Sequence, residues 1–88
     1  MVFVIIVYDV RQDRVTHIHK FLKGYLHWKQ NSVFEGRLSK GELSTVIGGI
    51  TDIIDPEYDM VYIYEAELEK YLTKTILGTP KRETRFIF

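Results

Sequence analysis

Apolar and aromatic residues run without a break from Val2 to Tyr8, in the segment VFVIIVY. The segment is rich in β-branched residues and too short for a helix, which predicts a strand over Val2–Tyr8. A strand with one wet face alternates apolar and polar residues, whereas this one is apolar on both faces. Both faces therefore need a cover, and a single carboxylate, Asp9, stands at the end of the strand.

Two later segments have the spacing of amphipathic helices. The first predicts a helix over residues 14–25 with Asp13 as its N-cap. Its apolar positions are Val15, Ile18, Leu22 and Tyr25, and the residues outside this stripe that would face water or a partner are Arg14, His17, Lys20 and Lys23. Ser39 and Glu42 form a capping-box pattern before the second helix. Its apolar positions are Leu43, Val46, Ile47, Ile50 and Ile54.

The segment from Trp28 to Leu38 predicts extended structure, and Gly36 indicates a bulge or bend within it. As one strand, this segment gives the order βαβαββ. A split near Gly36 into a hairpin, with WKQN and FEGRL on paired strands, gives the ferredoxin-like order βαββαβ. We favour the hairpin, and hence an α+β fold with two helices on one face of an antiparallel sheet. The next strand is Met60–Tyr64, followed by an extra strand near 71–77, a turn at 78–83 and a terminal strand near 85–88.

Two helices can cover only one face of a small sheet. Alternate residues of the first strand, Phe3, Ile5 and Val7, would then form part of an uncovered apolar face. Large apolar patches usually mark partner sites. The simplest cover is a second copy of the chain, related by a two-fold axis. The alternative is that the terminal segment folds back over this face, and we favour the homodimer.

Composition narrows the class of protein. The 88 residues predict one ferredoxin-like domain over 1–88, and the absence of cysteine excludes disulfides and thiol chemistry. The formal net charge is zero, yet the chain is basic from Arg11 to Lys29, acidic from Glu35 to Glu69 and basic again from Lys70 to Arg85. Such a distribution can form a positive surface that the average hides. The alternative is that these charges lie on solvated faces of unrelated elements, and the sequence alone slightly favours this alternative. No apolar run is long enough to span a bilayer, so we expect a cytoplasmic protein without membrane contact.

Asp9 is the candidate for chemistry. A carboxylate at a strand end is usually a turn-former or a helix cap, and in a monomer we would read it so. In a two-fold dimer its mate could lie opposite, and two carboxylates with waters suit Mg²⁺ or Mn²⁺. Such an ion could activate water against a phosphodiester. His17 and His19 are a poor chelating pair, since on a helix they are about 200° apart.

Three motifs occur in a specific order: YDV at residues 8–10, QNSVFEG at 30–36 and IIDPEYDMVYIY at 53–64. Together they resemble the CRISPR-associated protein 2 family, the small partner of the integrase that captures new spacers. The resemblance spans nearly the whole chain, including RVTHIHKFLKGYLHW at 14–28 and ILGTPKRETRFIF at 76–88. It implies a ferredoxin-like fold in a face-to-face homodimer, with the terminal strand often pairing with the partner's sheet.

The resemblance also implies site residues. Asp9 matches the family's aspartate, which binds one Mg²⁺ across the dimer axis. Arg14 matches a basic position early in the first helix. Other residues that match the pattern and would lie near Asp9 are Tyr8, Ser32 and Phe34.

The chain departs from the family pattern at two positions that bear on phosphate binding. Many members carry an arginine before the Gln-x-Ser-Val-Phe segment, where this chain has Trp28–Lys29. Only Lys29 can therefore supply charge there. His17 stands where a basic residue is common, so its charge would depend on pH.

Two functions follow from the resemblance. Members are described as metal-dependent endoribonucleases, and some as cutting duplex DNA. In that case Asp9 is the catalytic metal ligand, and Arg14 and Lys29 contact phosphates of RNA or duplex DNA. Alternatively, the protein is a structural adaptor that bridges integrase dimers, and basic residues from Arg11 to Lys29, His17 among them, and from Lys81 to Arg85 follow the DNA backbone.

Overall fold

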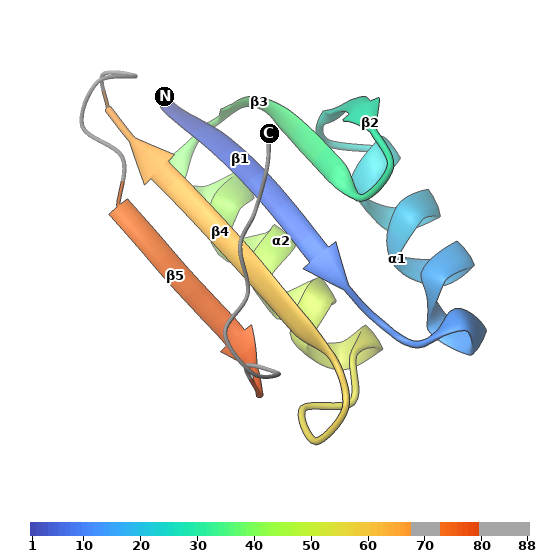
Figure 1. The fold of residues 1–88 in the computed structure, drawn as a ribbon. Helices are drawn as coiled ribbons and strands as arrows, with labels where there is room; N and C mark the ends of the chain where they lie inside the picture. The colour runs from blue at the N-terminus through green and yellow to red at the C-terminus, as the bar shows by residue number, and fades with distance from the viewer. Residues whose placement is uncertain (68–72, 80–88) are drawn as a thin grey trace.

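The protein folds as a sheet with helices packed behind it, shown in Figure 1 as a computed structural model that describes residues 1–67 and 73–79. In these residues the elements are β1 (Val2–Asp9), α1 (Gln12–Lys23), β2 (His27–Gln30), β3 (Val33–Leu38), α2 (Lys40–Ile53), β4 (Met60–Ala66) and β5 (Thr73–Gly78). The strand order is β2-β3-β1-β4-β5, and each of these neighbouring pairs is antiparallel. The ferredoxin-like prediction is confirmed, with β5 added beside β4.

The main core lies between the sheet and the two helices, which cover the same face of it (Figure 1). Alternate residues of β1 point into this core, as the strand's period of two requires. The fully buried side chains of the core include Val4, Ile6, Phe34, Ile18, Leu22, Val46 and Ile50. Neither described helix is long and apolar enough to cross a membrane.

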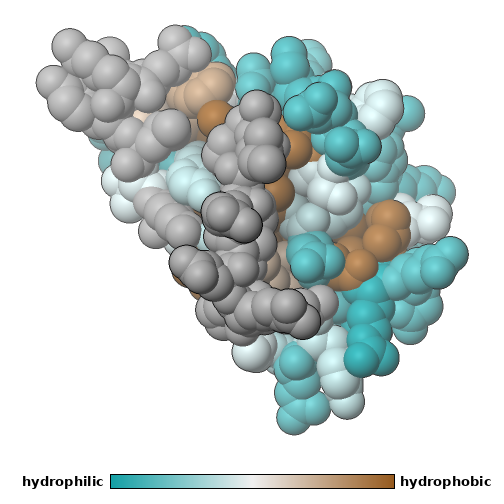
Figure 2. Space-filling model, viewed as in Figure 1, coloured by the Kyte–Doolittle hydropathy of each residue, from teal (hydrophilic) through white to brown (hydrophobic). Residues whose placement is uncertain are grey.

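The sheet surface away from the helices is termed the open face. It carries a second apolar cluster of Val7, Met60 and Tyr62, which are already buried within the chain at 8%, 1% and 4% exposure. The partly buried side chains of Ile5, Val33 and Tyr64 pack against this cluster. Val7 pairs with Tyr62, and residues directly opposite each other in an antiparallel pair share a face. Met60, Tyr62 and Tyr64 therefore point away from Val61 and Ile63, as predicted. Figure 2, viewed from this side, shows hydrophobic residues among the polar ones.

The predicted hairpin is formed by β2 and β3, but its turn is not at Gly36. The turn is Asn31–Ser32, and Asn31 has a φ of 44°, a left-handed conformation that asparagine tolerates better than most residues. Gly36 lies within β3 opposite Val4. A Cβ there would come within 3.0 Å of the Leu26 side chain, so this glycine provides space rather than a turn.

The irregularity expected at Gly36 is also displaced. The register of the β2–β3 pair shifts between Trp28 and Gln30, which places a bulge in the edge strand β2.

Both helices start close to their predicted positions. Arg11, not Asp13, is the N-cap of α1, and its side chain makes no capping bond. Asp13 instead lies in the first turn, where a carboxylate still suits the helix dipole. The capping box of α2 is confirmed, since the Glu42 N–H donates to Ser39 Oγ at 3.0 Å and the Ser39 N–H donates to Glu42 Oε1 at 2.9 Å.

Some predicted positions differ or fall outside the described residues. Ile18 and Leu22 are buried in α1, whereas Val15 is exposed. Tyr25 is also exposed, and it lies beyond the helix, which ends at Lys23 rather than at residue 25 as predicted. The extra strand is β5, which the structure describes from Thr73 to Gly78, and residues 71–72 of the predicted strand lie outside the described residues. The terminal strand near 85–88, and the turn beyond Thr79, lie outside the described residues.

Candidate metal and nucleic-acid site

Asp9 closes β1 and is exposed to solvent. It pairs with Met60, the first residue of β4. Because paired residues share a face, Asp9 lies on the open face, beside the apolar cluster of Val7, Met60 and Tyr62. A carboxylate here borders the surface that a second copy would cover.

The residues predicted to lie near Asp9 do come together, but mostly on the other face. The Tyr8 and Phe34 rings stack with centroids 6.2 Å apart, and both are buried beneath the helices. Ser32 joins them at the turn, where its carbonyl accepts the Tyr8 N–H at 3.1 Å. Burial raises the pKa of the Tyr8 hydroxyl, and a hydrogen bond with Ser32 partly opposes this. Tyr8 and Phe34 therefore support the end of β1 from below.

Asp59 is a residue that the sequence analysis did not single out. It precedes β4 and is fully buried, and its carboxylate accepts hydrogen bonds from Arg14 Nη2 at 3.0 Å and from Arg14 Nε. The backbone N–H groups of Arg11, at 2.9 Å, and Asp55, at 2.8 Å, complete the set. Asp59 thus joins the β1–α1 and α2–β4 connections, directly beside the Asp9–Met60 pair.

The electrostatics of this pair follow from its partners. Burial by itself raises the pKa of Asp59, but the hydrogen bonds from Arg14 and from the Asp55 and Arg11 backbone outweigh it and lower the pKa to about 2. The hydrogen bond to Asp59 in turn raises the pKa of the Arg14 guanidinium. Arg14 is therefore half-buried and engaged with Asp59, rather than turned outward as the helical pattern predicted.

The other predicted nucleic-acid residues lie at separate places. The Arg11 guanidinium lies over the Tyr58 ring, 4.0 Å from its centroid. Lys29 lies on the edge strand β2, with its Nζ 3.8 Å from the Glu35 carboxylate. His17 is exposed on α1. Arg11 and Arg14 thus meet at Asp59 near Asp9, while Lys29 is two strands away.

The described residues contain no group of three or more histidine, cysteine, aspartate or glutamate side chains placed to hold a metal ion. Mg²⁺ keeps several waters and is commonly bound by one or two carboxylates. A single exposed Asp9 with a second carboxylate from another copy fits that preference in ligand type, whereas one chain alone offers a weak site.

Comparisons with known proteins identify the family. The sequence profile of the family described as CRISPR associated protein Cas2 matches residues 1–74. The chain belongs to the Cas2 family. It is 42% identical over 82 residues to the "CRISPR-associated endoribonuclease Cas2" of Methanosarcina acetivorans, covering 93% of this chain and 94% of that protein.

Further Cas2 relatives cover the whole fold. The protein of the same name from Thermotoga maritima is 41% identical over 86 residues, covering 98% of this chain and 99% of that one. A solved structure described as "Crystal structure of cas2" superimposes with a TM-score of 0.75 at 40% identity, over 99% of this chain and 98% of that chain. The family, and the ferredoxin-like fold expected with it, are therefore confirmed.

Proposed function

We propose that this Cas2 protein is a Mg²⁺-dependent endoribonuclease whose site forms when two copies pair through their open faces. The observation that carries the proposal is the place of Asp9, an exposed carboxylate at the edge of an apolar sheet surface. The names of the Methanosarcina and Thermotoga relatives support the reaction class.

The homodimer follows from the open face. On this side of the sheet, away from the helices, Val7, Met60 and Tyr62 are buried, and the apolar side chains left for a partner to cover are the partly buried Ile5, Val33 and Tyr64. An apolar sheet face packs well against another sheet at about 10 Å, and a two-fold axis makes the two surfaces the same. If the axis passes near the end of β1, the partner's Asp9 faces this one and supplies the second carboxylate.

The Asp9 pair would hold Mg²⁺, or Mn²⁺, through carboxylate oxygens. When bound, such an ion lowers the pKa of a bound water and neutralises charge that develops on the phosphate. The protein's own part is to hold Asp9 in place. The buried Asp59 carboxylate with its hydrogen-bond partners, here termed the Asp59 clamp, fixes the connection that follows Asp9. Tyr8, stacked on Phe34, supports Asp9 from the helix side of the sheet.

The test compares wild type with Asp9→Asn, on RNA, single-stranded DNA and duplex DNA. We expect Mg²⁺-dependent cleavage of RNA by wild type, its loss on removal of Mg²⁺ with a chelator, and a fall of at least about 100-fold in Asp9→Asn. The physical reason is that an amide is a poorer ligand for Mg²⁺ than a carboxylate. The dimer should survive in the variant. If Asp9→Asn cuts RNA as fast as wild type, the proposed single-metal mechanism is wrong.

We also infer that the protein serves spacer acquisition together with a CRISPR integrase, which membership of the Cas2 family supports. The corresponding test is co-purification with the integrase of the same locus. Because the interaction does not need cleavage, Asp9→Asn should bind the integrase as well as wild type does.

A further inference from the structure

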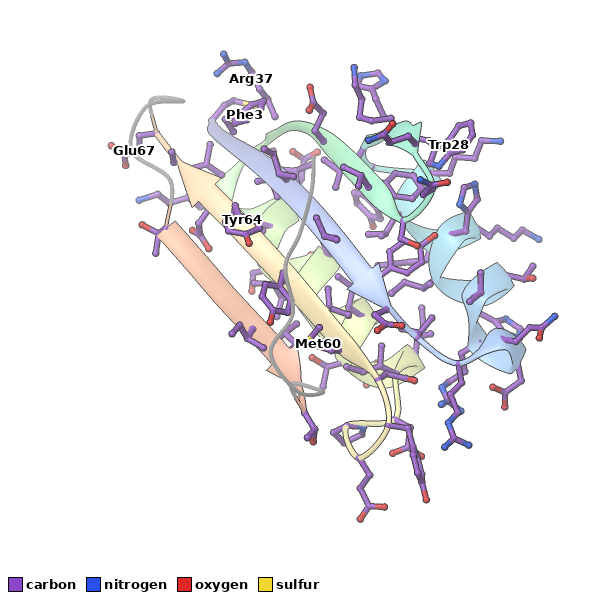
Figure 3. All side chains as sticks on the ribbon, viewed as in Figure 1. Phe3, Trp28, Arg37, Met60, Tyr64 and Glu67 are labelled. Atoms are coloured by element: carbon purple, nitrogen blue, oxygen red, sulfur yellow. The ribbon has the colours of Figure 1, made fainter. Side chains whose placement is uncertain are left out.

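Trp28 is the only tryptophan of the chain, and 54% of its surface is exposed. Other exposed aromatic rings in the described residues are partly covered. Tyr58 lies beneath the Arg11 guanidinium, and Tyr25 packs on Phe21 at 5.4 Å between centroids. Figure 3 shows Trp28 projecting from β2 at the outer edge of the molecule, on the side of α1. Exposure of so large a ring is costly in water, which makes its position informative.

The indole is held in place rather than left loose. Its Nε1 donates to the Asn31 carbonyl at 2.9 Å, across the bulged turn. One edge meets the His19 ring, with centroids 5.9 Å apart. His19 is itself fixed, since it packs edge-on against Phe34 at 5.1 Å and its Nδ1 lies 3.4 Å from the Tyr8 hydroxyl. A ring immobilised in this way loses little further entropy when a ligand stacks on it.

Positive charge lies on α1, the helix that carries His19. A shallow concavity of about 450 Å³ runs along α1, and His19 forms part of its wall. The concavity is lined by Val15, Thr16, His19, Lys20 and Lys23. Both lysines are exposed, and this set contains no acidic residue. His19 thus contacts the fixed Trp28 ring and also lines the concavity that contains the two exposed lysines, and proteins combine aromatic rings with cations in this way to hold single-stranded nucleic acid.

The ring is also linked to the end of β1. The Trp28 side chain donates a hydrogen bond to the carbonyl of Asn31. The carbonyl of the next residue, Ser32, accepts a hydrogen bond from the N–H of Tyr8 at 3.1 Å, and Tyr8 directly precedes Asp9. Along the sheet, Trp28 pairs with Phe34, and Phe34 pairs with Ile6, three residues before Asp9. Strand spacings of about 4.8 Å and a rise of about 3.4 Å per residue put the Trp28 and Asp9 backbones roughly 14 Å apart. Trp28 shares the helix-side face with Phe34, whereas Asp9 lies on the open face with Met60, so an RNA strand that contacts both residues has to pass around the edge of the sheet.

We propose that Trp28 is a stacking platform for one unpaired base of a single-stranded RNA, with its phosphates beside Lys20 and Lys23. This inference rests on the proposed function, since it names a second contact of the same substrate. A duplex cannot use the platform, because its bases are already stacked on one another. The platform therefore favours single-stranded over double-stranded substrate.

The single tryptophan makes the test direct. Tryptophan fluorescence is followed while a short single-stranded oligoribonucleotide is added to Asp9→Asn protein, which binds without cutting. We expect saturable quenching that weakens with added salt, as phosphate contacts require, and much less quenching by the duplex of the same sequence. Equal quenching by the duplex would overturn the proposal.

Affinity measured with a labelled oligonucleotide completes the test. Because one stacked base is lost, Trp28→Ala should bind single-stranded RNA about tenfold more weakly, while Trp28→Phe keeps most of the affinity. Tyr25→Ala, an exposed aromatic outside the Trp28–His19 contact, is the matched control and should bind normally. Unchanged binding by Trp28→Ala, or an equal loss in Tyr25→Ala, would contradict the platform.

The platform and the proposed reaction fail separately. If Asp9→Asn still cleaves but fluorescence is quenched as expected, the metal mechanism is wrong and the platform stands. If cleavage depends on Asp9 but Trp28→Ala binds and cuts like wild type, the platform alone is wrong. A role of Trp28 as a protein contact would appear as unchanged RNA affinity together with loss of integrase co-purification, and it too would overturn the proposal.

Discussion

Asp59 shows how much one buried charge can organise. Its carboxylate is fully buried and accepts hydrogen bonds from the Arg14 side chain and from two backbone N–H groups, at Arg11 and Asp55. Breaking a buried ion pair by removing one partner is strongly destabilising, because the other partner keeps its desolvation cost. The clamp therefore fixes the connection that follows Asp9 far more firmly than a surface ion pair could.

We predict that Asp59→Asn lowers the free energy of unfolding by about 3 kcal/mol, since Arg14 then loses its buried counter-charge. The measurement is urea unfolding at neutral pH. Asp13→Asn is the matched control, because Asp13 is exposed and pairs with the same arginine at 3.4 Å. It should change stability by less than about 1 kcal/mol. Equal losses in the two variants would contradict a buried clamp.

The same carboxylate predicts a pH dependence. Its pKa is about 2 in the folded protein, below the ordinary value of 3.8, so the folded state holds the ionised form more tightly. The stabilisation is therefore complete above about pH 5 and is lost as the pH falls toward 2. Unfolding measured across this range should show a steep acid loss in wild type and a shallower one in Asp59→Asn. Parallel curves would mean that Asp59 does not carry the acid sensitivity.

Single residues were the hardest level to predict from the sequence. The place of Asp9 at the end of β1 could be read directly, because it follows an unbroken apolar run. Asp59 could not, since its surrounding segment DPEYD reads as a turn and its partner Arg14 is 45 residues away. The available signal was that Asp59 directly precedes β4. The fold places β4 beside β1, and Arg11 and Arg14 follow β1.

At the scale of elements, one glycine, Gly49 of α2, makes room for a side chain of α1 where the two helices meet. A Cβ at Gly49 would overlap the ring of Phe21, so this α1 side chain packs directly against the α2 backbone there. At the neighbouring Gly48, nothing lies within 4 Å of such a Cβ. Gly48–Gly49 therefore does not break α2, which is continuous through both residues.

The two glycines make a matched pair for a stability test. We predict that Gly49→Ala destabilises by about 1–3 kcal/mol, because the methyl group must displace the Phe21 ring. Gly48→Ala should stabilise by up to about 1 kcal/mol, since alanine is the better helix former and meets no neighbour. Thermal unfolding of both variants measures the difference. A Gly49→Ala protein as stable as wild type would mean that the helices can shift apart at little cost.

Elements were predicted well where a local rule decides them. The capping box at Ser39 and Glu42 marked the start of α2 because both of its bonds lie within four residues. The hairpin turn was misplaced because a glycine suggested it, whereas Asn31 adopts the left-handed conformation there. The role of Gly36 depends on Leu26, which the tertiary fold brings beside it, and no local pattern contains that information.

For the whole molecule, the decisive feature is that the sheet is apolar on both faces while the helices cover only one. We predict that Ile5→Lys, on the open face, converts the proposed homodimer to a monomer and abolishes RNA cleavage, because a buried lysine would face its own copy across the axis. Sedimentation at micromolar concentration measures the mass. Val15→Lys, an exposed apolar position on α1, is the control and should remain dimeric. A dimeric Ile5→Lys protein would place the interface elsewhere.

The edge strand β2 has a further consequence. It is only four residues long, each of them exposed, and its ladder is interrupted by the bulge between Trp28 and Gln30. Short, bulged edge strands that contain a lysine, such as β2 with Lys29, are poor templates for the addition of another strand. Copies of the protein should therefore resist joining edge to edge into fibrils, even at the high local concentrations that form along a bound nucleic acid.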